Sequence, residues 1–170
     1  MMLKMIGATL IVIGCSAFGL IMVRNHRREV FALEQLIAAL DYMLSQLHYQ
    51  LTPLPELAGK AAEITKGVVG KVFRDFAAEL AIQISPSPEL CMDSILETTK
   101  DIPSVTKECL KSFSLTLGKF DLEGQENSLE ILRCTCRRKL EDYTKDQDIR
   151  LRSYRTLGVC AGVALMILFI

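Results

Sequence analysis

Residues 5–23 read MIGATLIVIGCSAFGLIMV, a stretch without a charged side chain, and Arg24, Arg27 and Arg28 follow it at once. A helix of this length is about 28 Å long, close to the roughly 30 Å hydrocarbon thickness of a bilayer. The stretch therefore predicts a transmembrane helix over residues 5–23.

A second apolar run closes the chain, and the predicted second transmembrane helix spans residues 156–170. It is short for a span, so we expect Arg152 and Arg155 to extend toward the membrane surface beside it. Gly158 and Gly162 form a G-x-x-x-G pattern, which permits close approach of two helices. We expect these glycines to pack the two spans on each other, with packing against another membrane protein as the alternative.

Basic residues flank the inner ends of both runs. They are Arg24, Arg27 and Arg28 after the first run and Arg150, Arg152 and Arg155 before the second. Positively charged residues favour the cytoplasmic side of a membrane. Both clusters therefore predict that the region between the spans, residues 24–155, is a cytoplasmic domain.

The segment Val12-Ile13-Gly14-Cys15 resembles the cleavage site of a bacterial lipoprotein. The residues after Cys15 continue the apolar run, whereas a mature lipoprotein usually becomes polar there. A retained transmembrane helix is the favoured interpretation, and lipidation at Cys15 is the alternative.

Composition argues against several functional classes. The formal net charge of the 170 residues is zero, so no basic surface for nucleic acid is indicated at the level of the whole chain. The two histidines and six cysteines do not have the spacing of a zinc site or a disulfide scaffold. Phosphate-binding loops and nucleophile motifs are also missing from the sequence. We predict no enzymatic activity, no cofactor, no metal and no small-molecule substrate.

An apolar stripe continues the first helix into the middle of the chain. Its members recur at steps of three and four residues, and Leu36 and Met43 widen the stripe. The stripe residues are Val30, Leu33, Ile37, Leu40, Leu44, Leu47 and Leu51. The pattern is compatible with a coiled-coil dimer, but the helices that follow favour a core within one chain.

Proline and glycine divide the rest into further helices. Thr52-Pro53-Leu54-Pro55-Glu56 ends the first helix and can begin the next, with Thr52 as N-cap. Gly67 and Gly70 predict a turn, Ser87 before Pro88 predicts an N-cap, and Asp101-Ile102-Pro103-Ser104 predicts a break. The expected helices cover about 57–64, 69–84, 88–100, 105–117 and 121–150. The predicted fold is all-α, a bundle of about six helices whose first and last helices are antiparallel and continuous with the terminal spans.

The densest basic run of the middle region comprises Arg133, Arg137, Arg138 and Lys139. A solvated helix face with surface ion pairs is the simpler interpretation. Docking of an acidic partner or of lipid headgroups is the alternative.

Three segments together resemble the stage III sporulation protein AB family. TPLPEL at 52–57 is similar to its T-P-L-P-E-A-L segment, and LGKFDLEGQ at 117–125 is similar to its L-G-x-x-D-x-x-x-Q segment. YRTLGVCAG at 154–162 matches its Y-x-x-L-G-x-x-x-G approach to the last span. The chain departs from the pattern at Phe120 and Gly124. The resemblance extends along the whole chain, including its length and its paired terminal spans.

The resemblance implies a membrane-anchored platform in the channel complex that joins mother cell and forespore during endospore formation. It implies a fold similar to the platform protein of type II secretion and type IV pilus machines. The implied partners are a secretion-type sporulation ATPase, other membrane components of the channel and membrane lipids. The implied location is the mother-cell membrane around the forespore, the outer forespore membrane.

Within the motifs that carry the resemblance, six residues more readily shape helix joints than contact a partner. They are Thr52, Pro53, Pro55, Gly118, Asp121 and Gln125. The competing functional hypothesis is a two-span receptor or signalling hairpin that acts by dimerisation through the 30–51 stripe.

Overall fold

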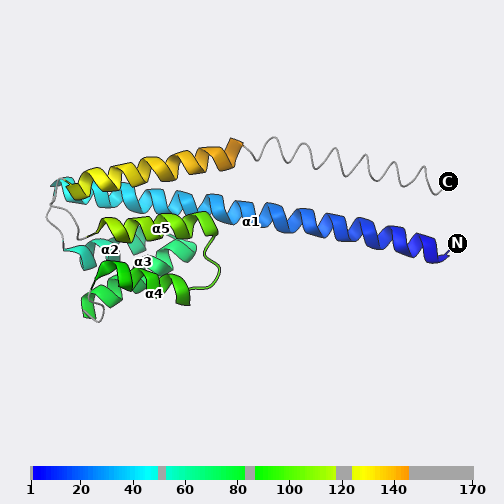
Figure 1. The fold of residues 1–170 in the computed structure, drawn as a ribbon, viewed down its shortest axis with the longest axis horizontal. Coiled ribbons are helices and arrows are strands. Elements are labelled where there is room, and N and C mark those ends of the chain that lie inside the picture. The colour runs from blue at the N-terminus through cyan, green and yellow to red at the C-terminus, as the bar shows by residue number, and fades with distance from the viewer. Residues whose placement is uncertain (1, 50–52, 83–86, 118–123, 146–170) are drawn as a thin grey trace. The chain divides into compact units, whose positions relative to one another are not determined.

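The computed structural model describes residues 2–49, 53–82, 87–117 and 124–145, with side chains from residue 24 to residue 47 in the first of these segments. Throughout these ranges the chain is helical apart from short connections, and it forms no strand there (Figure 1). The helices are α1 (Met2–Tyr49), α2 (Leu54–Ile64), α3 (Gly67–Ile82), α4 (Pro88–Thr98), α5 (Ser104–Thr116) and a further helix over residues 124–145, called here the last described helix. The predicted all-α fold with six helices is confirmed for this part of the chain.

Helix α1 runs without a break from Met2 to Tyr49. It includes the apolar residues 5–23 and the stripe that follows them, so the predicted continuity of the two is confirmed. The side chains of residues 2–23 lie outside the described part of the structure, and so does the predicted span over residues 156–170. Crossing of the membrane by either segment therefore stays a prediction.

One segment of the described residues, Arg24–Leu47, is long and apolar enough to cross a membrane by length and composition alone. Its apolar side chains are already used inside the chain, since Leu33, Leu36 and Leu40 have no exposed surface. We therefore assign the apolar face of this segment, around Leu33, Leu36 and Leu40, to the core of the helical bundle.

The chain divides into two compact units, which are considered separately here. The bundle unit is Arg28–Leu140, and the terminal unit comprises Met1–Arg27 with Glu141–Ile170. The predicted domain boundaries at residues 24 and 155 stay predictions.

The stripe on α1 is the centre of the core of the bundle unit. Leu33, Ile37 and Leu40 are buried, and Leu36 and Met43 are buried beside them. The core is completed by side chains from every other helix, chiefly Leu57, Ala58, Ala61, Val69, Val72, Phe73, Phe76, Met92, Ile95, Leu110, Phe113, Leu129 and Leu132. The preference for a core within one chain over a dimer seam is therefore confirmed. A dimer through the same stripe would require this core to open.

The connection between α2 and α3 is very short and depends on two glycines. Gly67 has a φ of 67°, a left-handed conformation that glycine adopts at little cost. Gly70 lies one turn into α3, where an added Cβ would be 2.5 Å from the carbonyl oxygen of Thr65. The predicted turn is therefore at Thr65–Lys66, and the expectation that Gly70 belongs to it was wrong. Position 70 has room only for glycine, because α3 starts against the end of α2.

The starts of α2, α4 and α5 differ in how they are capped. Ser87 Oγ accepts a hydrogen bond from the backbone N–H of Leu90 at 3.3 Å, which confirms the predicted N-cap of α4. Pro53 occupies the N-cap position of α2 and donates no side-chain group, so the prediction of Thr52 as N-cap was wrong. Pro103 likewise occupies the N-cap position of α5 without a capping side chain.

The last described helix is antiparallel to α1 within the bundle unit (Figure 1). Leu129, Leu132 and Cys136 turn toward the core, and Asp41 of α1 meets Arg133. The predicted antiparallel pairing of first and last helices is thus confirmed over the bundle unit.

Candidate functional site

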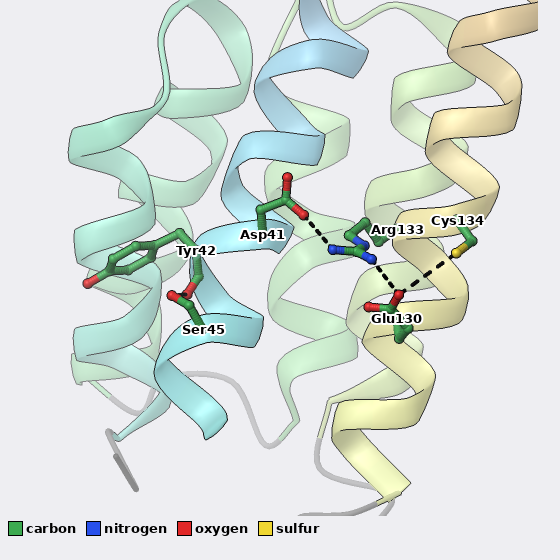
Figure 2. Close-up of polar contacts among 6 residues, drawn as sticks. All are labelled: Asp41, Tyr42, Ser45, Glu130, Arg133 and Cys134. Carbon is green, nitrogen blue, oxygen red and sulfur yellow. Dashed lines mark hydrogen bonds and ion pairs between the residues drawn. The ribbon is translucent and has the colours of Figure 1, made fainter. Parts of the chain in front are cut away.

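The seam between α1 and the last described helix carries the most connected polar group of the bundle unit (Figure 2). Arg133 Nη1 donates to Asp41 Oδ1 at 3.0 Å, and Arg133 Nη2 donates to Glu130 on its own helix. The thiol of Cys134 lies 4.0 Å from the same Glu130 oxygen. The hydrogen bond to Asp41, with the charge of Glu130, raises the pKa of Arg133. Arg133 therefore ties two helices that are far apart in sequence.

This arrangement separates the members of the basic run that the sequence singled out. The Arg133 side chain is only 28% exposed, because two carboxylates of the same chain hold it. Arg137 and Arg138 are exposed, and neither guanidinium has a carboxylate partner among the described residues. Lys139 Nζ lies 3.1 Å from Glu108 Oε2 of α5. Of the four, Arg137 and Arg138 are the ones that a partner or a headgroup can reach without competition.

A buried carboxylate that the sequence did not indicate caps α5. Glu29 Oε1 accepts hydrogen bonds from the backbone N–H of Thr106 at 2.8 Å and from Thr106 Oγ1 at 2.9 Å. Glu29 is 6% exposed although it directly follows Arg28 in the basic cluster. Pro103 supplies no cap, and the negative carboxylate at the start of a helix takes that role. A capless helix start was readable from Pro103, but the identity of the distant acceptor was not.

A residue within the first basic cluster, His26, contacts Tyr143 from the other sequence segment of the terminal unit. The imidazole N–H at His26 Nε2 donates to the carbonyl oxygen of Tyr143 at 2.9 Å. The two rings also stack, with centroids 5.2 Å apart. His26 therefore joins the two helical segments that lead toward the predicted spans.

Two buried thiols face each other between α5 and the last described helix. Cys109 and Cys136 are 2% and 0% exposed, and both are reduced. The thiol of Cys136 hydrogen-bonds to Cys109, which lowers the pKa of Cys109; this contact and burial raise the pKa of Cys136. Both cysteines are therefore small side chains of the buried core.

The predicted helix-joint residues divide into those that are described and those that are not. Pro53 accepts the first helical hydrogen bond of α2 from Leu57 N at 3.0 Å, and Pro55 lies in the first turn. Gln125 lies in the first described turn of the last described helix. Thr52, Gly118, Asp121, Gly158 and Gly162 lie outside the described residues.

Across the described ranges no group of three or more His, Cys, Asp or Glu side chains is placed to hold a metal ion. The polar clusters found there join helices to one another.

Comparison with known proteins identifies the family of the chain. The family model for stage III sporulation protein AB matches residues 4–170. The chain belongs to the stage III sporulation protein AB family. The resemblance seen in the three sequence motifs is thereby confirmed.

A curated relative, stage III sporulation protein AB of Bacillus subtilis strain 168, is 27% identical over 170 residues. The alignment covers 98% of this chain and 99% of the relative. A solved structure titled stage III sporulation protein AB (SpoIIIAB) is similar with a TM-score of 0.63 and 23% identity. It covers 72% of this chain and 98% of the solved chain, and it supports the fold. The comparisons therefore assign the chain to a sporulation family.

Proposed function

We propose that this member of the stage III sporulation protein AB family is a membrane-anchored platform in the channel complex between mother cell and forespore. In this role the helical bundle docks a secretion-type ATPase on the cytoplasmic side, and the terminal helices hold the bundle at the membrane. The proposed location is the mother-cell membrane around the forespore. The role is mechanical, and no residue is assigned to catalysis.

The observation that carries the proposal is the continuity of α1 in a member of a sporulation family. One helix includes the uncharged residues 5–23 and, further along, the centre of the bundle core at Leu33, Leu36 and Leu40. A load on the bundle is therefore transmitted to the apolar segment through helix backbone without an intervening loop. The Asp41–Arg133 ion pair joins the last described helix to the same element.

The ATPase partnership is tested by co-purification from sporulating cells. The full chain, tagged and extracted from membranes in mild detergent, is expected to bring down the ATPase in stoichiometric amounts. A tagged, unrelated two-span membrane protein is the control. Absence of the ATPase from the purified complex, with the tagged chain present in the membrane fraction, would contradict the proposed docking.

The receptor alternative has less support. It requires the stripe on α1 to pair with a second copy, but Leu33, Leu36 and Leu40 are covered by helices of the same chain. A chain that is monomeric in detergent and still supports spore formation would exclude it.

A further inference from the structure

Four cysteines lie in the described part of the chain, and two of them are in contact with each other. Cys91 and Cys134 each have a glutamate as partner. The thiols of Cys109 on α5 and Cys136 on the last described helix are instead hydrogen-bonded to one another. Both thiols are reduced and buried within the bundle unit, and the proposed platform role does not use them.

The two helices are also held together beside the thiols. Lys139, which follows Cys136 by one turn, has its Nζ atom 3.1 Å from Oε2 of Glu108, the residue before Cys109. Both cysteines belong to the same hydrophobic core cluster. The contact between the sulfur atoms is therefore part of a packed helix–helix contact. Formation of a disulfide requires two sulfur atoms that already lie close together in this way.

The two thiols of the pair are chemically different. The hydrogen bond from Cys136 lowers the pKa of Cys109, and the positive charge of Lys139 acts in the same direction. The same hydrogen bond, together with burial, raises the pKa of Cys136. The thiolate is the form that attacks a disulfide. Cys109 is thus the attacking thiol of the pair, and Cys136 is the thiol that follows.

We propose that Cys109 and Cys136 form a reversible, redox-sensitive cross-link that ties the last described helix to α5. This cross-link is independent of the ATPase partnership. In a reducing compartment both thiols stay free, and the two helices are held by packing and by the Lys139–Glu108 pair. Under oxidising conditions a covalent bond holds the last described helix to the bundle.

The oxidant is a small-molecule disulfide, written here RSSR. The Cys109 thiolate attacks one sulfur atom of RSSR, the bond between its two sulfurs breaks, and the first thiolate leaves as RSH after it takes up a proton. Cys136 then loses its proton and attacks the Cys109 sulfur, which displaces the second RSH. Two cysteine thiols are oxidised to one disulfide, and RSSR is reduced to two RSH. Because both thiols are buried, the oxidant reaches them through local opening of the bundle.

The cross-link changes the stability of the bundle in a measurable way. It closes a loop of roughly 30 residues, which restricts the unfolded chain more than the folded one. The oxidised protein is therefore expected to unfold at a temperature about 5 °C or more above that of the reduced protein. Reduction with dithiothreitol should return the unfolding temperature to its initial value.

The test exposes the folded full chain, in mild detergent, to 2,2′-dipyridyl disulfide. Proteolysis in acid followed by mass spectrometry maps the cysteines, and circular dichroism follows thermal unfolding. We expect a peptide pair joined through Cys109 and Cys136, with the rise in unfolding temperature. Cys109→Ser should abolish both the joined peptides and the rise. The matched control is Cys134→Ser, which removes an exposed thiol and should keep both.

The mapping is made on the wild-type chain, so it does not depend on the folding of any variant. Separate dipyridyl-derived adducts on Cys109 or Cys136, or two unreacted thiols beside a modified Cys134, would overturn the cross-link. A joined peptide pair without a change in unfolding temperature would overturn its locking effect. An equal rise in unfolding temperature in Cys109→Ser would also contradict the assignment. None of these results bears on the ATPase partnership, which is tested separately by co-purification.

Discussion

Glu29 and Thr106 are 77 positions apart in sequence, yet one oxygen of the Glu29 carboxylate accepts both the backbone N–H and the hydroxyl of Thr106. The contact joins the beginning of α1 in the bundle unit to the beginning of α5. It supplies the acceptor for two buried donors of Thr106, because Pro103 at the N-cap position has no side chain that could accept a hydrogen bond. Glu29, which directly follows the first basic cluster, is thus part of the folded core.

Replacement of Glu29 by alanine is expected to lower the free energy of unfolding by about 1–3 kcal/mol, because two buried donors of Thr106 lose their acceptor. Glu29→Gln keeps a carbonyl oxygen and is expected to lose less. Thermal unfolding of the full chain in detergent, followed by circular dichroism, measures both. Glu34→Ala, an exposed glutamate on the same helix, is the control and should stay within about 0.5 kcal/mol of wild type. Equal effects at Glu29 and Glu34 would contradict a capping role.

Gly70→Ala is expected to destabilise the protein by roughly 1–3 kcal/mol, although alanine normally favours a helix over glycine. The reason is the carbonyl oxygen of Thr65, which would lie 2.5 Å from the new Cβ. Gly59→Ala is the matched control, because its added Cβ would meet only the Ala77 Cβ at 3.9 Å. That variant is expected to be neutral or stabilising by up to about 1 kcal/mol. Chemical denaturation of both variants checks the opposite signs.

The Asp41–Arg133 pair is expected to contribute about 0.5–1 kcal/mol of coupling energy, since both side chains keep contact with solvent. A double-mutant cycle with Asp41→Ala and Arg133→Ala measures it directly. Arg137→Ala is the control, because this exposed arginine has no partner among the described residues and should not change stability measurably. Coupling near zero would mean that the Asp41–Arg133 pair does not help to hold the last described helix against α1.

Stability is expected to fall as pH rises from about 9 toward 12, in part because of Cys91. Burial, together with the hydrogen bond to Glu79, raises the pKa of Cys91 from 9.0 to about 12. Between these values the unfolded chain has lost the thiol proton and the folded chain retains it, so alkali favours unfolding. Cys91→Ala should flatten this part of the stability profile. Cys134→Ala, which removes an exposed thiol, should leave the profile unchanged.

The sequence predicted the features of the fold that depend on local signals. The apolar stripe from Val30 to Leu47, the break at Pro53 and the cap at Ser87 were each readable because the residues that determine them lie within a few positions of one another. The placement of Gly70 was misjudged because its smallness is required by the end of another helix, which spacing along the chain does not indicate.

The candidate site was less predictable because its contacts are long-range. Arg133 was recognised as part of a basic run, but its partner Asp41 is 92 positions away. Glu29 was not recognised at all, since a glutamate beside three arginines resembles an ordinary surface residue.

The long separation in sequence between α1 and the last described helix, which packs on it, also has a consequence during synthesis. Leu33, Leu36 and Leu40 leave the ribosome early, while Leu129 and Leu132, which complete the same core, follow about a hundred residues later. At bacterial rates of roughly 5–20 residues per second, the nascent chain carries an uncovered apolar face for several seconds. Release of an incomplete chain that ends before residue 124 would leave that face available for aggregation, so full-length translation is itself a condition for solubility of the bundle.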